Sequence, residues 1–284
     1  RYFSSAASDV YKRQVQIHSA HGYLLSEFLS PDINLRSDEW GGAIENRTRI
    51  HVEIIKSIRQ ELGSDFPISV KMNSADFQKG GFTPEEAVVA AKIIESAGVD
   101  NIEVSGGTYE QPKLLGLDKV SVQPKRSEIR KNSTIAREAY FLKYAEDIKK
   151  HTTVPLMVTG GFRTKEGMER AIKSRDCEII GVGRPLCANP FAIKDLLEGK
   201  IDHLPSYEKT LSLGPGPLSP SSPFRIIQAL NAFGAQAWFY QQIKRMGNNK
   251  PPNLKMGLFS ALRRDAREDK EAFRKLKNKT TTHT

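Results

Sequence analysis

The sequence predicts an α/β protein of the TIM (β/α)₈ barrel type, here reduced to about strands 4–8 and followed by C-terminal helices. Strand-like and helix-like segments alternate from residue 15 to about residue 184, which is typical of βα units on a parallel sheet. Every strand candidate ends in polar residues or glycine. A barrel spreads its site over all strand ends in this way, whereas an open sheet concentrates it at one switch point.

The strand candidates are short and rich in Val and Ile. In the second one Ile68, Val70 and Met72 alternate with polar Lys71 and its neighbours, as expected of a strand with two different faces. A barrel needs eight strands, so we expect the first three βα units to be absent from this chain. The five candidates are Val15–His18, Pro67–Asn73, Ile102–Ser105, Leu156–Thr159 and Ile179–Val182.

Helix signals lie between the strands. Isoleucines at positions 50, 54 and 58 and a leucine at position 62 step by four along one face. The segment Thr83–Glu86 is a capping box with proline at the first helical position, and Gly98 ends that helix. We also expect helices over Thr134–Lys150 and Lys165–Ser174.

The chain is expected to divide into four parts. Residues 1–14 show no strand or helix period and are expected to be a non-native leader, and residues 15–207 are expected to form a partial barrel. Residues 208–223 are rich in Pro, Gly and Ser and are expected to form a linker. Residues 224–284 are expected to form a helical extension with a basic tail.

The net charge of +10 is concentrated at the C-terminus. Between Lys244 and Lys279 twelve Lys and Arg stand against four Asp and Glu, a surplus of eight. Without interleaved aromatic residues this pattern favours a solvated helix face, and we expect no nucleic-acid partner. No apolar run suits a membrane-spanning helix, so no membrane partner is expected. Two cysteines without a CxxC pattern favour a cytoplasmic location.

Three ring side chains follow the first strand: His18, His21 and Tyr23. The two histidines could present N–H groups to one oxygen, and the tyrosine could add a proton. Alternatively the histidines could be a zinc pair, although zinc needs a third protein ligand, and the pair could also belong to the core.

Other candidate residues lie at later strand ends. By alternation Lys71 faces the same side as Ser69 and could stabilise a developing anion, or could simply pair with Glu103. Two glycine-rich turns, "VTGGFRT" and "GVGRPL", offer backbone N–H groups for a phosphate, and Arg184 adds a charged fork.

The segment "VQIHSAHGYLLSEFLSPDINLRSDEWGGAIENRTRI" closely resembles the signature of the old yellow enzyme family, the FMN-dependent ene-reductases, with Trp40 in place of the usual tyrosine. The resemblance runs from about Val15 to Tyr207. It implies that His18 and His21 bind the substrate's oxygen and that Tyr23 donates the proton. It also implies FMN contacts from Lys71, where most members have arginine, and from the two glycine-rich turns, namely Gly160, Gly161, Phe162, Gly183 and Arg184.

The resemblance implies an oxidoreductase that passes hydride from NADPH or NADH through FMN to an activated alkene, with a small-molecule substrate and a possible homo-oligomer. The family's flavin contacts from its N-terminal units are not in the chain, so we expect Arg1–Thr284 alone to hold FMN weakly. Two alternatives remain: a metal-dependent barrel hydrolase built on His18 and His21, and a binding module built on the basic tail. The resemblance includes no metal site.

Overall fold

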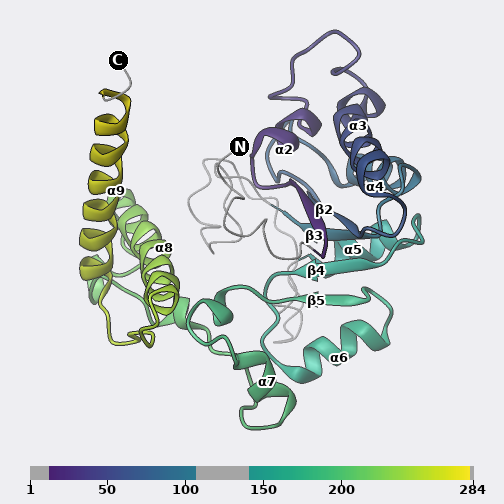
Figure 1. Ribbon diagram of the computed structural model, residues 1–284. Helices are drawn as coiled ribbons and strands as arrows, with labels where there is room; N and C mark the ends of the chain where they lie inside the picture. The colour runs from purple at the N-terminus through teal and green to yellow at the C-terminus, as the bar shows by residue number, and fades with distance from the viewer. Residues whose placement is uncertain (1–12, 107–140, 282–284) are drawn as a thin grey trace. The chain divides into compact units, whose positions relative to one another are not determined.

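The computed structural model of the chain describes residues 13–106 and 141–281 (Figure 1). The chain divides into two compact units. The first comprises Arg1–Phe162 and Glu166–Gly181, and the second Arg163–Lys165 and Val182–Thr284. The first unit carries the strands, and the second is mainly helical.

The first unit is built on one parallel sheet whose strands are paired in chain order, as expected for consecutive units of a barrel. Sequential parallel strands joined through helices are the arrangement that the alternating pattern predicted, and all five strands lie within two residues of their predicted bounds. The strands are β1 (Val15–Ser19), β2 (Ile68–Asn73), β3 (Asn101–Ser105), β4 (Leu156–Thr159) and β5 (Ile179–Gly181).

The two faces of the sheet differ in chemistry. One face carries apolar side chains such as Val70, Ile102 and Leu156, which are fully buried in the main core. The opposite face carries polar side chains on β1, β2 and β3. The register aligns His18 with Lys71, and Lys71 with Glu103, at one level across three strands. The alternation predicted for Lys71 is confirmed, since its side chain lies opposite the buried apolar face.

The helices of the first unit follow the strands in turn. In Figure 1, α3 and α4 lie beside the sheet, and α3 also packs on α2. The capping box of α4 is present, with the Glu86 N–H donating to Thr83 Oγ1 at 3.2 Å. The helices are α2 (Leu24–Leu29), α3 (Ile44–Leu62), α4 (Pro84–Ser96), α5 (Leu142–Lys149) and α6 (Lys165–Lys173), the last of which begins in the second unit.

The buried face of α3 lies beside the isoleucine stripe of the sequence, and Ile54 and Ile58 of that stripe are partly buried against the core. Leu62, at the end of that stripe, is 53% exposed, whereas His51 and Ile55 are fully buried. The His51 ring is accommodated because Ser19 Oγ lies 2.5 Å from its Nε2, which ties α3 to β1. A polar partner on the strand therefore allows a histidine in the middle of the buried face of α3.

Arg47 joins three segments at the start of α3. Its side chain is only 3% exposed. Its Nε donates to the Gly42 carbonyl at 2.9 Å, and its two terminal nitrogens donate to the Leu29 carbonyl and the Glu86 carboxylate. A buried guanidinium with all these partners holds α2, α3 and α4 together.

The second unit is a helical assembly around Trp238. Helices α8 and α9 lie side by side (Figure 1), and Trp238 Nε1 donates to the Met256 carbonyl at 2.9 Å. Gly234 permits this close approach, since a Cβ there would lie 3.2 Å from the Leu258 Cβ. The elements are η3 (Arg184–Cys187), α7 (Ala192–Leu197), η4 (Tyr207–Lys209), η5 (Gly216–Leu218), α8 (Arg225–Gly247) and α9 (Leu258–Thr281).

The face of α8 that packs against α9 differs from the apolar stripe of its sequence. Within the described chain Phe233 and Tyr240 are 63% and 48% exposed, while Asn231 and Gln241 are buried. Asn231 Oδ1 accepts from the Leu213 N–H, and Gln241 donates to Glu268. The buried face of α8 thus combines Trp238 and Ala237 with polar side chains whose hydrogen bonds are satisfied.

Some predictions fall on residues that the structure does not describe. These are most of the predicted leader and the first part of the helix predicted from Thr134. The predicted domain boundaries remain predictions, and by compactness the division falls after Gly181. No helix among the described residues combines the length and the apolar character needed to cross a bilayer.

We predict that Arg47→Met lowers the free energy of unfolding by about 3 kcal/mol, because it removes one partner of a buried ion pair and orphans two carbonyls. Arg36→Met is the matched control, since the Arg36–Asp38 pair is exposed and should contribute little. Urea denaturation followed by circular dichroism measures both variants. Equal losses in the two would contradict the account of Arg47.

Candidate functional site

The three ring residues predicted from the sequence lie together at the end of β1. The ring centroids of His18 and His21 are 5.3 Å apart with the planes at 80°, and those of His18 and Tyr23 are 5.0 Å apart. Tyr23 is 46% exposed and His18 is also exposed, so the cluster opens to solvent. The structure therefore brings together two imidazoles and a phenol that a small molecule can reach.

His21 occupies a strained turn that is held from two strands. Its φ of 66° is left-handed, which costs about 1 kcal/mol for a residue other than glycine. Its N–H donates to Asn73 Oδ1 at 3.1 Å, and its Nε2 lies 2.8 Å from Ser105 Oγ. If Ser105 is the donor, the ring proton of His21 stays on Nδ1 and remains available to a ligand.

Both histidines are neutral near pH 7. Burial, followed by the charge of Lys71, lowers the pKa of His18. Burial, Lys71 and His18 together lower the pKa of His21 to about 4. A neutral imidazole keeps one N–H and one free nitrogen, so each ring can donate to an oxygen without carrying a charge.

Lys71 forms an ion pair with Glu103 on the polar face of the sheet. Lys71 Nζ lies 2.9 Å from Glu103 Oε1, and Gln16 Nε2 donates to the other carboxylate oxygen at 2.7 Å. Burial opposes ionisation of Glu103, but the hydroxyl of Thr159, Lys71 and Gln16 outweigh it and hold the pKa of the carboxyl below its ordinary range. The salt bridge considered from the sequence is therefore present.

The turn after β4 is built from two glycines in left-handed conformations. The φ angles of Gly160 and Gly161 are 134° and 87°, which side-chain-bearing residues rarely adopt. They precede α6, so backbone N–H groups are accessible near the start of that helix. The Phe162 side chain is 2% exposed and belongs to the main core, which leaves only its backbone for a cofactor.

Gly183 and Arg184 lie in the second unit, where Arg184 begins η3. Arg184 Nη1 lies 3.6 Å from Glu208 Oε1, and Arg163 Nη2 lies 2.9 Å from the same oxygen. Glu208 thus places two guanidinium groups around one carboxylate oxygen. An anion that used Arg184 would have to share it with Glu208 or displace Glu208.

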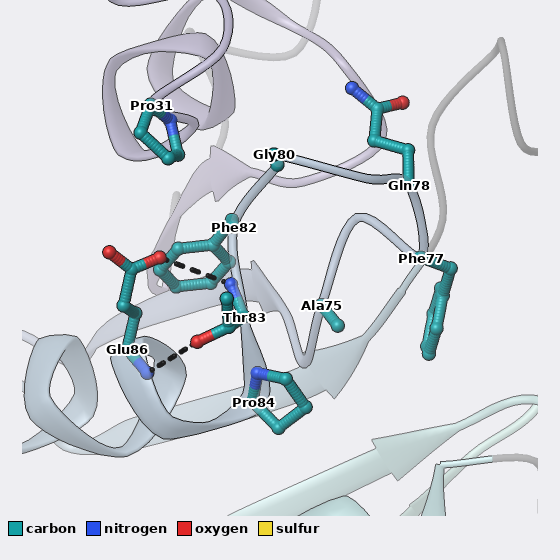
Figure 2. A pocket seen from close by; sticks show the side chains of 10 residues that line it. Pro31, Ala75, Phe77, Gln78, Gly80, Phe82, Thr83, Pro84 and Glu86 are labelled. Carbon is teal, nitrogen blue, oxygen red and sulfur yellow. Dashed lines mark hydrogen bonds between the residues drawn. The ribbon is translucent and has the colours of Figure 1, made fainter.

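A shallow pocket of about 350 Å³ lies over the segment between β2 and α4 (Figure 2). The polar groups of Thr83 and Glu86 at its edge bond to each other in the capping box. None of the three ring residues lines this pocket, so the chemistry of the rings is separate from it.

The described residues contain no group of three or more His, Cys, Asp and Glu side chains placed to hold a metal ion. Both cysteines are free, and burial raises the pKa of Cys177 to about 11. The third ligand that a zinc site on His18 and His21 would need is thus not found in this part of the chain.

Two contributors were missed by the sequence interpretation. Asp76, three residues after Asn73 and 2% exposed, accepts from Asn73 Nδ2 at 3.0 Å. Glu208 sits at the start of the segment that the sequence predicts as a linker. The Asn-x-x-Asp spacing just after a strand was a usable signal for Asp76, but no sequence pattern marks Glu208.

Residues 5–202 match the NADH:flavin oxidoreductase / NADH oxidase family. The NADH-dependent flavin oxidoreductase iccE of Talaromyces variabilis is 35% identical over 237 residues, which are 82% of this chain and 54% of the relative. The NADH-dependent flavin oxidoreductase iliE of Hypocrea jecorina (strain QM6a) is 40% identical over 188 residues, 64% of this chain and 44% of the relative. The chain thus spans about half the length of these relatives.

Among solved structures, a 2-naphthoyl-CoA reductase in complex with 2-naphthoyl-CoA matches with a TM-score of 0.56 and 29% identity. The match covers 68% of this chain and 27% of that one. Together with the sequential parallel sheet it identifies the first unit as part of a TIM barrel, as the sequence predicted.

We predict that stability falls as the pH is lowered from 6.5 to about 4. In that interval the unfolded chain protonates His51, while burial lowers the pKa of the folded His51 to about 4. Once the pH has fallen to about 4, this difference in protonation of His51 lowers the free energy of unfolding by about 3 kcal/mol. Above pH 6.5 His51 is neutral in both states and has no such effect. Urea denaturation across this range should show a shallower pH slope for His51→Gln. An unchanged slope in the variant would exclude His51 as a source.

Proposed function

Since the chain belongs to the NADH:flavin oxidoreductase / NADH oxidase family, we propose that it reduces an activated alkene, of the enone type, with hydride from NADH delivered by way of bound FMN. The observation that supports the substrate class is the pair of neutral imidazoles at the end of β1. Two neighbouring, uncharged N–H donors suit a carbonyl oxygen, which gains negative charge as hydride adds to the conjugated carbon.

We assign His18 and His21 to the substrate oxygen. The ring of His21 is fixed by Ser105, and that of His18 is exposed beside it. Tyr23 is assigned the proton transfer to the substrate carbon, since its ring lies next to His18 at the mouth of the cluster. Together, the two histidines would polarise the substrate carbonyl and Tyr23 would protonate the substrate carbon.

The positive charge of Lys71 on the polar face suits a bound flavin. FMN, when bound, accepts and donates the hydride, and its ring system gains negative charge on reduction. Lys71 lies at the level of His18 in the register and could supply the compensating positive charge. The Glu103 carboxylate holds the Lys71 ammonium at 2.9 Å. This contact fixes the position of the cation and weakens the electric field that it exerts on the flavin.

The phosphate of FMN is assigned to the turn after β4, where Gly160 and Gly161 present backbone without side chains. In the second unit, Gly183 has open space where a Cβ would stand, and Arg184 shares Glu208 with Arg163. A phosphate contact from these two residues stays a prediction of the sequence. NADH is preferred over NADPH because the names of both fungal relatives specify it.

A metal-dependent hydrolase is the weaker candidate, since the family uses flavin and no third metal ligand is found in the described residues.

The free state of both cysteines suits the cytoplasmic location expected from the sequence. A homo-oligomer remains a prediction.

The double variant His18→Ala/His21→Ala tests the assignment of the substrate oxygen, with FMN supplied in excess. We expect oxidation of reduced protein by an enone to slow by about 10²-fold or more, since two donors to the developing anion are lost. Reduction by NADH should be unchanged in rapid-mixing measurements. His151→Ala, an exposed histidine at the end of α5, is the control. Undiminished enone turnover in the double variant would refute the assignment.

A second prediction concerns Lys71. Lys71→Gln/Glu103→Gln replaces the ion pair by a neutral one, and should lower the midpoint potential of bound FMN by about 30 mV, the equivalent of about 1.4 kcal/mol. Lys71→Arg keeps the cation and should leave the potential nearly unchanged. Equal potentials in all three proteins would mean that Lys71 does not face the flavin.

A further inference from the structure

We propose that Asp76 and Asn73 are positioning residues for His21: Asp76 fixes which way the Asn73 amide points, and Asn73 holds the turn that presents His21. Neither residue takes part in the roles assigned above. The consequence for catalysis rests on the proposed function, because it gives His21 the substrate oxygen. The positioning itself depends only on the geometry of the first unit.

First, Asn73 holds the backbone turn at His21. A φ of 66° is uncommon for histidine, so surrounding contacts must maintain it. The His21 N–H donates to Asn73 Oδ1 at 3.1 Å. Asn73 is the last residue of β2 and 1% exposed, so it is a rigid place from which to hold the turn.

The second step is the polarity of the amide. An asparagine side chain has one acceptor oxygen and one donor nitrogen, and only its oxygen can meet the His21 N–H. Asn73 Nδ2 donates to Asp76 Oδ1 at 3.0 Å. A carboxylate can only accept, so Asp76 forces the Asn73 nitrogen toward itself and the Asn73 oxygen toward His21.

The third step is the fixing of Asp76, which is 2% exposed. Its Oδ2 accepts from the Phe82 N–H at 3.0 Å and from the Ser30 hydroxyl. Its own N–H donates to the Phe82 carbonyl at 3.0 Å. Gly81 leaves room for this carboxylate, since a Cβ there would lie 3.0 Å from the Asp76 Cβ. Hydrogen bonds from the segment after α2 and from the segment before α4 therefore fix the Asp76 side chain.

An exchange of the two side chains tests this chain of contacts. Asn73→Asp places two carboxylates face to face. Asp76→Asn places two NH₂ groups face to face or, with the amide reversed, leaves the Phe82 N–H without an acceptor. In Asn73→Asp/Asp76→Asn every donor again meets an acceptor: the new aspartate accepts from His21 and from the new asparagine, whose oxygen serves Phe82 and Ser30.

The readout is the titration of the His21 ring, followed by NMR on the full chain without flavin. The pKa of His21 is lowered to about 4 by burial, Lys71 and His18, with an opposing contribution from Glu103. We expect it to move toward 6.5 in Asp76→Asn, as the ring leaves its position, and further in Asn73→Asp, where the added carboxylate also favours the imidazolium. In the double variant, which restores every hydrogen bond, the pKa should fall below its value in Asn73→Asp. Ile94→Val, which weakens the core of α4, is the control and should leave this titration unchanged.

Single variants that fold and keep the wild-type titration would overturn the proposal, and so would a folded double variant whose His21 pKa is no lower than in Asn73→Asp. Asn73→Ala gives a second route, because it removes the acceptor without adding charge, and an unchanged titration there would refute the role of Asn73. Enone turnover that survives His18→Ala/His21→Ala would exclude the proposed function alone and leave the NMR result standing.

Discussion

The in-register parallel pairing of β1, β2 and β3 is the constraint on which the site depends. It brings His18, Lys71 and Glu103 to one level of the sheet. Two residues further along the strands, on the same face, it sets Asn73 opposite Ser105. Because side chains alternate along a strand, a shift of one residue would send all of these groups to the buried apolar face. The hydrophobic core thus constrains the polar arrangement, since burial of the face that carries Val70 excludes any shift by an odd number of residues.

Burial, together with the charge on this face, keeps the histidines neutral. Lys71 disfavours protonation of both rings, while Glu103 compensates Lys71 and is itself stabilised by Gln16. A single cation beside two neutral donors is well suited to a reaction in which negative charge appears on substrate and cofactor in turn. Replacing one member of the Lys71–Glu103 pair would leave a buried charge unpaired, so the two residues are best considered as one unit.

Strand positions and the ring cluster were predictable because they depend on local patterns: alternation in β2, the capping box of α4 and the close spacing of His18, His21 and Tyr23. The buried faces of α3 and α8 were predictable only in part, because polar side chains with hydrogen-bond partners lie there beside apolar ones, as with His51 and Asn231. Contacts between residues distant in sequence were also out of reach. Only the folded chain brings Asp76 to Ser30, or Glu208 to Arg163.

The central claim is that one oxygen of the substrate is held jointly by His18 and His21. It is tested most directly by a crystal structure of the FMN-loaded protein with a saturated ketone that it cannot reduce. The account predicts the ketone oxygen within hydrogen-bond distance of a nitrogen on each ring, with Tyr23 beside the bound molecule. A ketone oxygen that contacts neither ring, or a flavin bound away from Lys71, would contradict it.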